Sequence, residues 1–228
     1  MSSSKSFLIT GSNRGIGLEL VRESLNKGYF VIGTFRNKLK SKELLAIKSN
    51  KFNSFEMDVT HEASISDVSS KLTKPIDFLV CNAGVNNGYG NFFDEDHSYE
   101  KMLEVLKVNV LGCILTIRNF RKNLNDNAKI IIISSILGIQ MHRGSTAAIY
   151  RASKVAVNNV MISVSEEFKT ENITVVSFHP GWVRTDMGGA DATFSAKESA
   201  LALIKSFDNL SFKDTGKFFN YDGTLINF

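Results

Sequence analysis

The sequence predicts an α/β fold in which a parallel sheet is covered by helices on both faces. Short apolar runs rich in β-branched residues alternate along the chain with longer segments whose apolar residues recur at helical spacing. Regular alternation of strand and helix is typical of parallel strands joined by crossover helices. The almost continuous apolar run Ile130–Ile133 suits a strand that is buried on both of its faces.

One strand is predicted for each apolar run. In chain order these strands are Ser6–Thr10, Phe30–Phe35, Phe52–Met57, Asp77–Cys81, Lys129–Ser134, Thr174–His179 and Lys217–Asn220. Val, Ile, Thr and Phe are frequent in these runs, as expected for side chains that pack on a pleated, half-buried surface. The prediction is therefore a sheet of about seven strands.

Helical segments separate the strands. They are Ile16–Leu25, Leu39–Lys48, Glu62–Leu72, Tyr99–Leu124, Ala147–Phe168 and Ala196–Phe207. In the first of them, Ile16, Leu20 and Val21 fall on one stripe, which predicts a helix that packs on the sheet. No repeat, linker or low-complexity stretch interrupts the pattern, so residues 1–228 are predicted to form a single domain.

The composition is that of a globular protein. With 43% hydrophobic and 22% charged residues, the chain is too apolar to remain disordered. No segment approaches the roughly 20 apolar residues of a membrane span, and no apolar stretch precedes the first strand. A cytoplasmic protein without membrane contact is therefore expected. Cys81 and Cys113 lie in apolar segments, which predicts buried free thiols in a reducing compartment.

The charge balance points to an anionic partner without identifying it. Lys and Arg number 27 and Asp and Glu number 23, so the net charge is +4. A mild basic excess is compatible with partners that range from nucleic acid to a phosphorylated cofactor. The chain has no basic stripe and no motif that mixes aromatic and basic residues, so nucleic acid is not expected.

A glycine-rich turn, Thr10-Gly11-Ser12-Asn13-Arg14-Gly15-Ile16-Gly17, joins the first strand to the first helix. Gly11 lets the chain turn off the strand, Gly15 lets a phosphate approach the helix N-terminus, and Gly17 lets the helix pack close to the sheet. In this strand–turn–helix context the pattern predicts a dinucleotide site. The alternative is a glycine-rich turn that binds no ligand.

The end of the second strand indicates which dinucleotide binds. Folds that prefer NAD place an acidic residue there for the ribose hydroxyls. Here Phe35 is followed by Arg36, and no carboxylate appears before Glu43. An arginine forks two hydrogen bonds to a phosphate that an acid would repel, and Arg14 in the glycine turn is placed to approach the same group. These residues predict NADP(H) in preference to NAD(H). The alternative is that Arg36 is a solvated surface charge.

A set of polar residues marks candidate chemistry. Tyr150 and Lys154, four residues apart, share one face of a predicted helix. The strand before them ends in Ser134-Ser135, and Asn109 sits inside a helical segment, where an amide competes with the backbone. A Tyr-x-x-x-Lys spacing is weak evidence when it stands alone. Its weight here comes from the other members of the set.

With these motifs in this order, the sequence resembles a classical short-chain dehydrogenase/reductase over essentially its whole length. The matching motifs are Thr10-Gly-x-x-x-Gly-x-Gly17, Asp58-Val59, Asn82-Ala83-Gly84, Asn109, Ser135, Tyr150-x-x-x-Lys154 and Pro180-Gly181. The stretches that resemble the C-factor/sniffer-like carbonyl reductases are Tyr150–Lys154, Pro180–Gly189 and Gly216–Gly223. The resemblance implies a doubly wound Rossmann fold of about seven parallel strands, bound NADP(H), and hydride transfer to an aldehyde or ketone.

The resemblance also implies roles for the catalytic residues. Tyr150 donates a proton to the alkoxide formed from the carbonyl, and Lys154 favours the phenolate and binds the nicotinamide ribose. Ser135 hydrogen-bonds the substrate oxygen, with Ser134 as the alternative. Asn109 perturbs its helix, so that a backbone carbonyl holds a water that relays protons to Lys154.

Further site residues are carried over by position. The expected cofactor contacts are Gly11, Asn13, Arg14, Gly15, Ile16, Gly17, Arg36, Asp58, Val59, Asn82, Ala83, Gly84, Tyr150, Lys154, Pro180, Gly181, Val183 and Thr185. Cys81 replaces the Asn that the family usually has at that position. The expected substrate pocket includes Gln140, Met141, Trp182 and Met187, which favours a largely apolar carbonyl compound. The histidines show no metal-ligand spacing, so no metal site is expected.

Assembly and an alternative function complete the expectations. The family commonly forms homodimers or homotetramers, and Phe218 and Phe219 are expected at such a contact. The alternative function is a catalytically silent NADP-binding regulatory protein of the same fold. Because such proteins typically lack the Tyr or the Lys, the presence of Tyr150 and Lys154 favours the enzyme.

Overall fold

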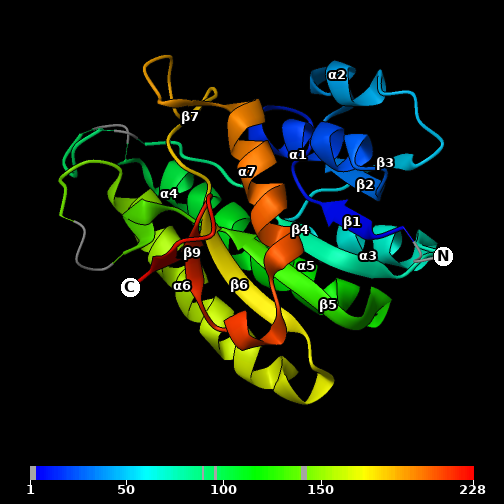
Figure 1. The fold of residues 1–228 in the computed structure, drawn as a ribbon. Helices are drawn as coiled ribbons and strands as arrows, with labels where there is room; N and C mark the ends of the chain where they lie inside the picture. The colour runs from blue at the N-terminus through cyan, green and yellow to red at the C-terminus, as the bar shows by residue number, and fades with distance from the viewer. Residues whose placement is uncertain (1–3, 89, 95–96, 140–142) are drawn as a thin grey trace.

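The centre of the protein is an eight-stranded sheet with the order β10-β9-β6-β5-β4-β1-β2-β3 (Figure 1). The structure is a computed structural model that describes residues 4–88, 90–94, 97–139 and 143–228. The strands of this sheet are β1 (Ser6–Ile9), β2 (Phe30–Phe35), β3 (Phe52–Glu56), β4 (Ile76–Cys81), β5 (Leu124–Ile133), β6 (Thr174–His179), β9 (Phe218–Asn220) and β10 (Leu225–Ile226). The strand order reverses between β1 and β4, and open α/β sheets bind ligands at such a reversal.

The predicted fold class is confirmed. The strands expected from the sequence are β1 to β6 and β9, and all of them pair in parallel. β10 adds an antiparallel edge to β9, and a small separate pair joins β7 (Val183–Arg184) to β8 (Phe194–Ser195). These three strands were not predicted, because two residues are too few to show an alternating pattern.

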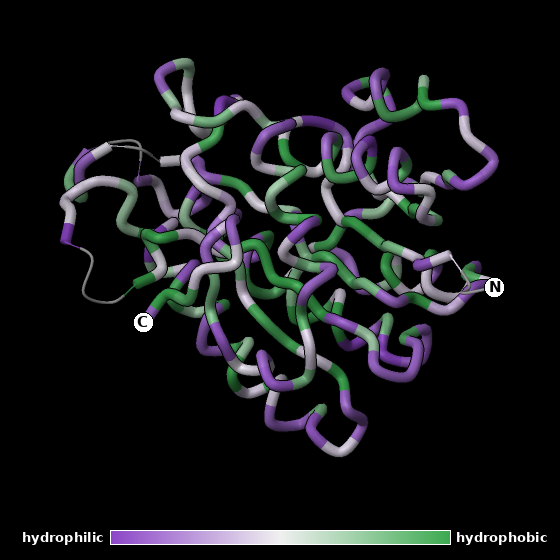
Figure 2. The backbone as a smooth tube through the Cα atoms, viewed as in Figure 1, coloured by the Kyte–Doolittle hydropathy of each residue, from purple (hydrophilic) through white to green (hydrophobic). Residues whose placement is uncertain are grey.

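Helices cover both faces of the sheet. On one face α1 (Gly15–Asn26) and α7 (Ala196–Asn209) lie side by side, with the short α2 (Lys42–Leu45) near them. On the other face lie α3 (Glu62–Lys71), α4 (Tyr99–Leu106), α5 (Gly112–Phe120) and α6 (Ala148–Glu167). Figure 2 shows the inner strands as hydrophobic and the outer turns as hydrophilic, as expected for a sheet that is covered on both sides. No helix of the described residues is long and apolar enough to span a bilayer.

Two predicted helices differ from the structure. The segment Leu39–Lys48 contains only a 3₁₀ turn and the four residues of α2, because Leu44 is buried while Leu39 points into solvent, so no continuous apolar face forms. The segment Tyr99–Leu124 is divided by a π-helical stretch, η3 (Lys107–Leu111), and its last residue already belongs to β5. The cause of this division is the side chain of Asn109, described below.

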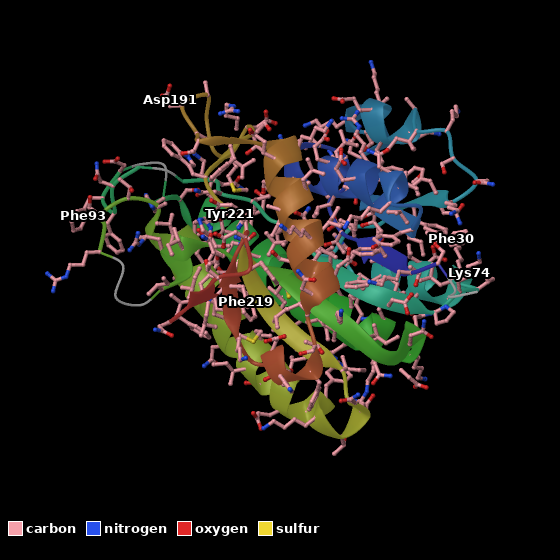
Figure 3. All side chains as sticks on the ribbon, in the orientation of Figure 1. Phe30, Lys74, Phe93, Asp191, Phe219 and Tyr221 are labelled. Atoms are coloured by element: carbon pink, nitrogen blue, oxygen red, sulfur yellow. The ribbon has the colours of Figure 1, made fainter. Side chains whose placement is uncertain are left out.

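The expected role of two phenylalanines in subunit contact is wrong. Phe218 and Phe219 of β9 are buried within the chain itself, so their rings offer no surface to a partner. Phe219 stacks on Phe178 of β6 with ring centroids 5.4 Å apart, and Phe178 meets Phe207 of α7 edge-on at 5.0 Å. Phe219, labelled in Figure 3, therefore packs into the core through Phe178, which in turn contacts α7.

We predict that Phe178→Ala lowers the free energy of unfolding by about 3–5 kcal/mol, because it removes a ring that is 0% exposed and leaves a cavity between two other rings. Chemical denaturation followed by circular dichroism measures the change. The matched control is Phe93→Ala, whose ring is 95% exposed and whose loss is expected to change stability by less than about 0.5 kcal/mol. Equal effects of the two variants would contradict the packing described here.

Candidate active site

A cleft of about 830 Å³ crosses the carboxyl ends of the central strands. Its walls come from the β1–α1 turn, from the residues after β2, β3 and β4, from the end of β5, from α6 and from the segment after β6. The expected cofactor residues in its wall are Gly11, Asn13, Arg14, Gly15, Ile16, Gly17, Arg36, Asp58, Val59, Asn82, Ala83, Gly84, Tyr150, Lys154, Pro180 and Thr185. The fold thus brings most of the expected set to one place.

The glycine turn is closely packed. Gly11 and Gly15 have φ angles of +66° and +55°, which favour glycine, and Gly15 lies against the side chain of Thr185. A Cβ at Gly17 would lie 2.3 Å from the Gly11 carbonyl oxygen. Helix α1 begins at Gly15 with no side chain capping its first N–H groups. These free donors at the positive end of a helix fit an anionic phosphate group.

Hydrogen bonds connect the glycine turn to the end of β4. The Asn82 amide Nδ2 donates to the backbone oxygens of Thr10 (2.8 Å) and Gly11 (3.1 Å). In return, Thr10 Oγ1 accepts from the backbone N–H groups of Asn82 and Ala83, each at 3.0 Å. Thr10 was part of the glycine motif in the sequence, but its role as an acceptor for the end of β4 was not predicted.

Asp58 stands at the end of β3 and remains an acceptor. Its Oδ1 accepts from the N–H (2.9 Å) and the hydroxyl (2.8 Å) of Thr60. Burial acts to raise the pKa of Asp58, but these hydrogen bonds and the charge of Arg36 outweigh it, so the pKa lies below its usual value. The carboxylate is therefore ionised and able to accept from a ligand amine at neutral pH.

Both expected phosphate ligands lie in the cleft wall, and each is paired with an acid. Arg14 forms an ion pair with Asp186, which follows β7. Arg36 Nη1 lies 3.8 Å from Glu104 Oε1 on α4. Neither acid was identified from the sequence, because their partners are far away along the chain and no short motif links them.

Tyr150 and Lys154 lie on the first turns of α6, and both are buried. Lys154 Nζ lies 5.5 Å from the centroid of the Tyr150 ring and donates to the Ile133 carbonyl oxygen at 2.8 Å. Burial lowers the pKa of Lys154 to about 8, while the nearby Cys113 acts in the opposite direction. A cationic group with an unusual pKa beside a phenol in a cleft is typical of a proton-transfer site.

Asn109 explains the π-helical segment. Its Oδ1 accepts from the Val85 N–H at 2.8 Å, and its Nδ2 donates to the Val85 oxygen at 2.9 Å and to Ser153 Oγ at 3.0 Å. Ser153 Oγ in turn donates to the Tyr150 carbonyl oxygen at 2.6 Å. Asn109 is buried, which excludes a solvent-exposed polar residue in mid-helix. Its side chain joins the β4–α4 loop to the helix that carries Tyr150.

The two serines after β5 differ in the use of their hydroxyl groups. Ser134 lines the cleft, but its hydroxyl donates to the Lys154 carbonyl oxygen at 3.4 Å. Ser135 Oγ accepts from the Leu137 N–H at 3.1 Å, and its own hydroxyl proton has no acceptor among the described residues. Ser135 is therefore the serine with a donor to spare, whereas Ser134 is the one of the two that is among the residues lining the cleft.

The segment after β6 completes the cleft. Gly181, with a φ of +85°, packs against Phe194 and Tyr221, and β7 places Val183 in the interior. Met187 lines the cleft, whereas Trp182 is largely exposed and its indole N–H donates to the Gly188 oxygen at 2.9 Å. The other two expected pocket residues, Gln140 and Met141, lie outside the described residues. Within the described ranges no group of His, Cys, Asp or Glu could hold a metal ion.

Comparison with known proteins identifies the family. Residues 5–195 match the family model described as short chain dehydrogenase. An uncharacterized oxidoreductase of Saccharomyces cerevisiae is 33% identical over 98% of this chain and 97% of its own length. C-signal of Myxococcus xanthus is 34% identical over 68% of this chain and 93% of its own length. The protein belongs to the short-chain dehydrogenase family of oxidoreductases.

Solved structures agree with this assignment. Carbonyl reductase Sniffer of D. melanogaster superposes with a TM-score of 0.92 at 30% identity and covers 99% of this chain and 100% of its own. The NADPH-bound carbonyl reductase from chicken fatty liver has a TM-score of 0.88 at 30% identity and covers 99% of each chain. Together with the match to C-signal, these similarities confirm the resemblance to the C-factor/sniffer-like subgroup.

We predict that the difference in the free energy of unfolding between the wild type and Lys154→Met increases as the pH rises from about 8 to about 10. The folded pKa of about 8 is below the ordinary 10.5, so in this range the folded protein binds fewer protons than the unfolded chain. The difference is expected to grow by about 1–3 kcal/mol, and urea unfolding at several pH values measures it. The exposed Lys205, changed to Met, serves as the control and is expected to give a constant difference. A constant difference for Lys154 as well would refute the depressed pKa.

Proposed function

We propose that the protein is an NADPH-dependent reductase that transfers hydride to the carbonyl of an aldehyde or ketone, with Tyr150 as the proton donor and residues 1–228 as one nucleotide-binding domain. The observation that carries this proposal is the buried pair of Tyr150 and Lys154 in the wall of the cleft that begins at the glycine turn. The pair places a proton source and a cation together in the cleft that also receives the cofactor. The carbonyl reductases among its structural neighbours support the same reaction class.

The residues present fit a dinucleotide. The uncapped start of α1 and the side-chain-free surface of Gly15 suit a pyrophosphate, and the ionised Asp58 suits the adenine amino group. Arg14 and Arg36 suit a 2′-phosphate, which favours NADP(H) over NAD(H). When bound, the nicotinamide cofactor supplies the hydride, and the protein supplies position and electrostatics.

Proton transfer is assigned to α6. A carbonyl that accepts hydride becomes an alkoxide, and the Tyr150 hydroxyl is the proposed donor of the proton it needs. The charge of Lys154, 5.5 Å from the ring centroid, stabilises the phenolate that remains. Because its pKa is about 8, Lys154 is mostly charged at neutral pH and yet able to exchange a proton with little cost.

Two further residues support this step. The free hydroxyl donor of Ser135 is proposed to hydrogen-bond the carbonyl oxygen of the substrate and to stabilise the developing negative charge. Asn109 is proposed as a positioning residue, since its side chain holds Val85 and Ser153 and thereby the start of α6. The π-helical turn at Asn109 interrupts the regular α-helical hydrogen bonding, which supports the family expectation that a backbone carbonyl of this segment holds a water.

A small carbonyl compound of apolar character is the proposed substrate. Met187, which lines the cleft, and Trp182, which is exposed, are the described apolar residues of the expected pocket. A homodimer or homotetramer remains a prediction. The exposed apolar residues of the helices, such as Leu111 of η3 and Ile162 of α6, are now better candidates for that contact than Phe218 and Phe219.

We predict that Tyr150→Phe abolishes turnover and leaves NADPH affinity within a few-fold of wild type, because the ring stays and only the proton donor is lost. A panel of aldehydes, ketones and quinones, followed by NADPH absorbance, measures turnover, and fluorescence titration measures binding. Tyr99→Phe, at an exposed ring on α4, is the control and is expected to be fully active. Activity retained in Tyr150→Phe would reject Tyr150 as the donor. Wild-type protein that binds NADPH but reduces no member of the panel would favour the silent regulatory protein.

We predict that Arg36→Asp weakens binding of NADPH at least tenfold more than binding of NADH, because the acid repels the 2′-phosphate and accepts from the ribose hydroxyls of NADH. Isothermal titration calorimetry with both nucleotides measures the ratio. Arg118→Asp, on α5 and outside the cleft wall, makes the same charge change as a control. Equal losses for the two nucleotides would remove Arg36 from the cofactor site.

A further inference from the structure

Two carboxylates hold the arginines that face the cleft. Arg14 comes from the glycine turn and pairs with Asp186 from the loop between β7 and β8. Arg36 follows β2 and lies near Glu104 from α4. Arg14, Arg36 and Asp186 line the cleft, and Glu104 pairs with Arg36. Each ion pair joins segments that are far apart in the sequence.

We propose that Asp186 and Glu104 set how strongly the protein prefers NADPH to NADH, because they compete with the 2′-phosphate for the two arginines. The proposal rests on the proposed function, in which Arg14 and Arg36 receive that phosphate. It assigns a specificity role to two acids that do not themselves bind the cofactor.

In the Arg14–Asp186 pair, a phosphate group can replace the carboxylate as the partner of the arginine. The side chains of this pair are 64% and 76% exposed, and exposed ion pairs in proteins are weak because water screens them. Arg14 lies just before α1, so its guanidinium is within the segment that faces a ligand at the helix N-terminus once Asp186 is displaced. A phosphate dianion accepts two charge-assisted hydrogen bonds from a guanidinium and displaces a single carboxylate.

In the Arg36–Glu104 pair, a third residue orients the carboxylate. Asn87 Nδ2 donates to Glu104 Oε2 at 2.6 Å, which orients the carboxylate so that its other oxygen lies 3.8 Å from Arg36 Nη1. Arg36 also acts electrostatically on Asp58, so it stands near two negative charges. A 2′-phosphate that approaches Arg36 therefore meets repulsion from Glu104 and replaces its contact.

The competition between these acids and a ligand affects only the 2′-phosphate of NADPH. NADH has hydroxyls where NADPH has the 2′-phosphate, so it does not need either arginine to leave its acid. Removal of a carboxylate is therefore expected to strengthen binding of ligands that contain an adenosine 2′-phosphate and to leave NADH nearly unchanged. The ratio of the two affinities reports the effect and cancels general changes in the site.

The experiment measures dissociation constants by isothermal titration calorimetry for wild type, Asp186→Asn and Glu104→Gln. The probes are NADPH, NADH and adenosine 2′,5′-bisphosphate, which carries the 2′-phosphate without the nicotinamide. Each variant is expected to bind NADPH and the bisphosphate about two- to five-fold more tightly, with NADH unchanged, because an exposed ion pair has that much to release. The shift is expected to shrink at high salt.

Each matched control removes one negative charge from the same loop or helix as the tested acid. Asp191→Asn changes an exposed acid in the same loop as Asp186, and Figure 3 shows it at the outer tip of that loop. Glu100→Gln changes an exposed acid one turn before Glu104 on α4. Both controls are expected to keep the wild-type ratio of NADPH to NADH affinity. A shift in the controls as large as in the variants would show a general charge effect and overturn the proposal.

The remaining outcomes separate this proposal from the proposed function. An NADPH-selective wild type with an unchanged ratio in Asp186→Asn or Glu104→Gln overturns the role of that carboxylate and leaves the proposed function standing. A wild type that binds NADPH and NADH equally overturns the proposed cofactor preference, and with it this proposal. Circular dichroism of every variant establishes that each is folded before binding is compared.

Discussion

The site depends on the close approach of α1 to the carboxyl ends of β1 and β4. A side chain at Gly17 would run into the Gly11 carbonyl and the Asn82 amide, so the helix start reaches this depth only because position 17 has no Cβ. The same contact places Thr10, Asn82 and Gly11 in one hydrogen-bonded group at the reversal of strand order. The free N–H groups of α1 are thereby directed into a cleft rather than into solvent.

A second constraint connects the β4–α4 loop to α6, the helix that carries Tyr150 and Lys154. Asn109 interrupts its own helix in order to bond Val85, and through Ser153 it reaches the backbone of Tyr150. A buried amide that satisfies a loop and a helix together is costly to replace, because its partners would be left without hydrogen bonds. The irregular π-helical turn is the local cost of holding α6 at a defined position.

The charges that a ligand meets in the cleft are set by the neighbours of each side chain and not by the net charge of the chain. The chain has a net charge of +4, but the two arginines that face the cleft are each next to an acid, and Lys154 is isolated from solvent. The excess positive charge of the whole chain therefore says little about the ligand. The position of Arg36, in the place where an acid would mark a preference for NAD, is far more informative.

Sequence patterns predict the seven longer strands of the main sheet, most of the helices between them, the glycine turn and the candidate residues Asn109, Tyr150 and Lys154. Each of these is expressed over a few consecutive residues, as a hydrophobic period, a turn requirement or a helix spacing. The family resemblance already implied that Asn109 perturbs its helix, but only the three-dimensional structure shows that Leu39–Lys48 is mostly not helical and that Phe218 and Phe219 are buried. It also decided that Asp186 and Glu104 face the cleft arginines. The physical reason is that burial and ion pairing depend on groups far apart in the chain, which meet only after the sheet has formed.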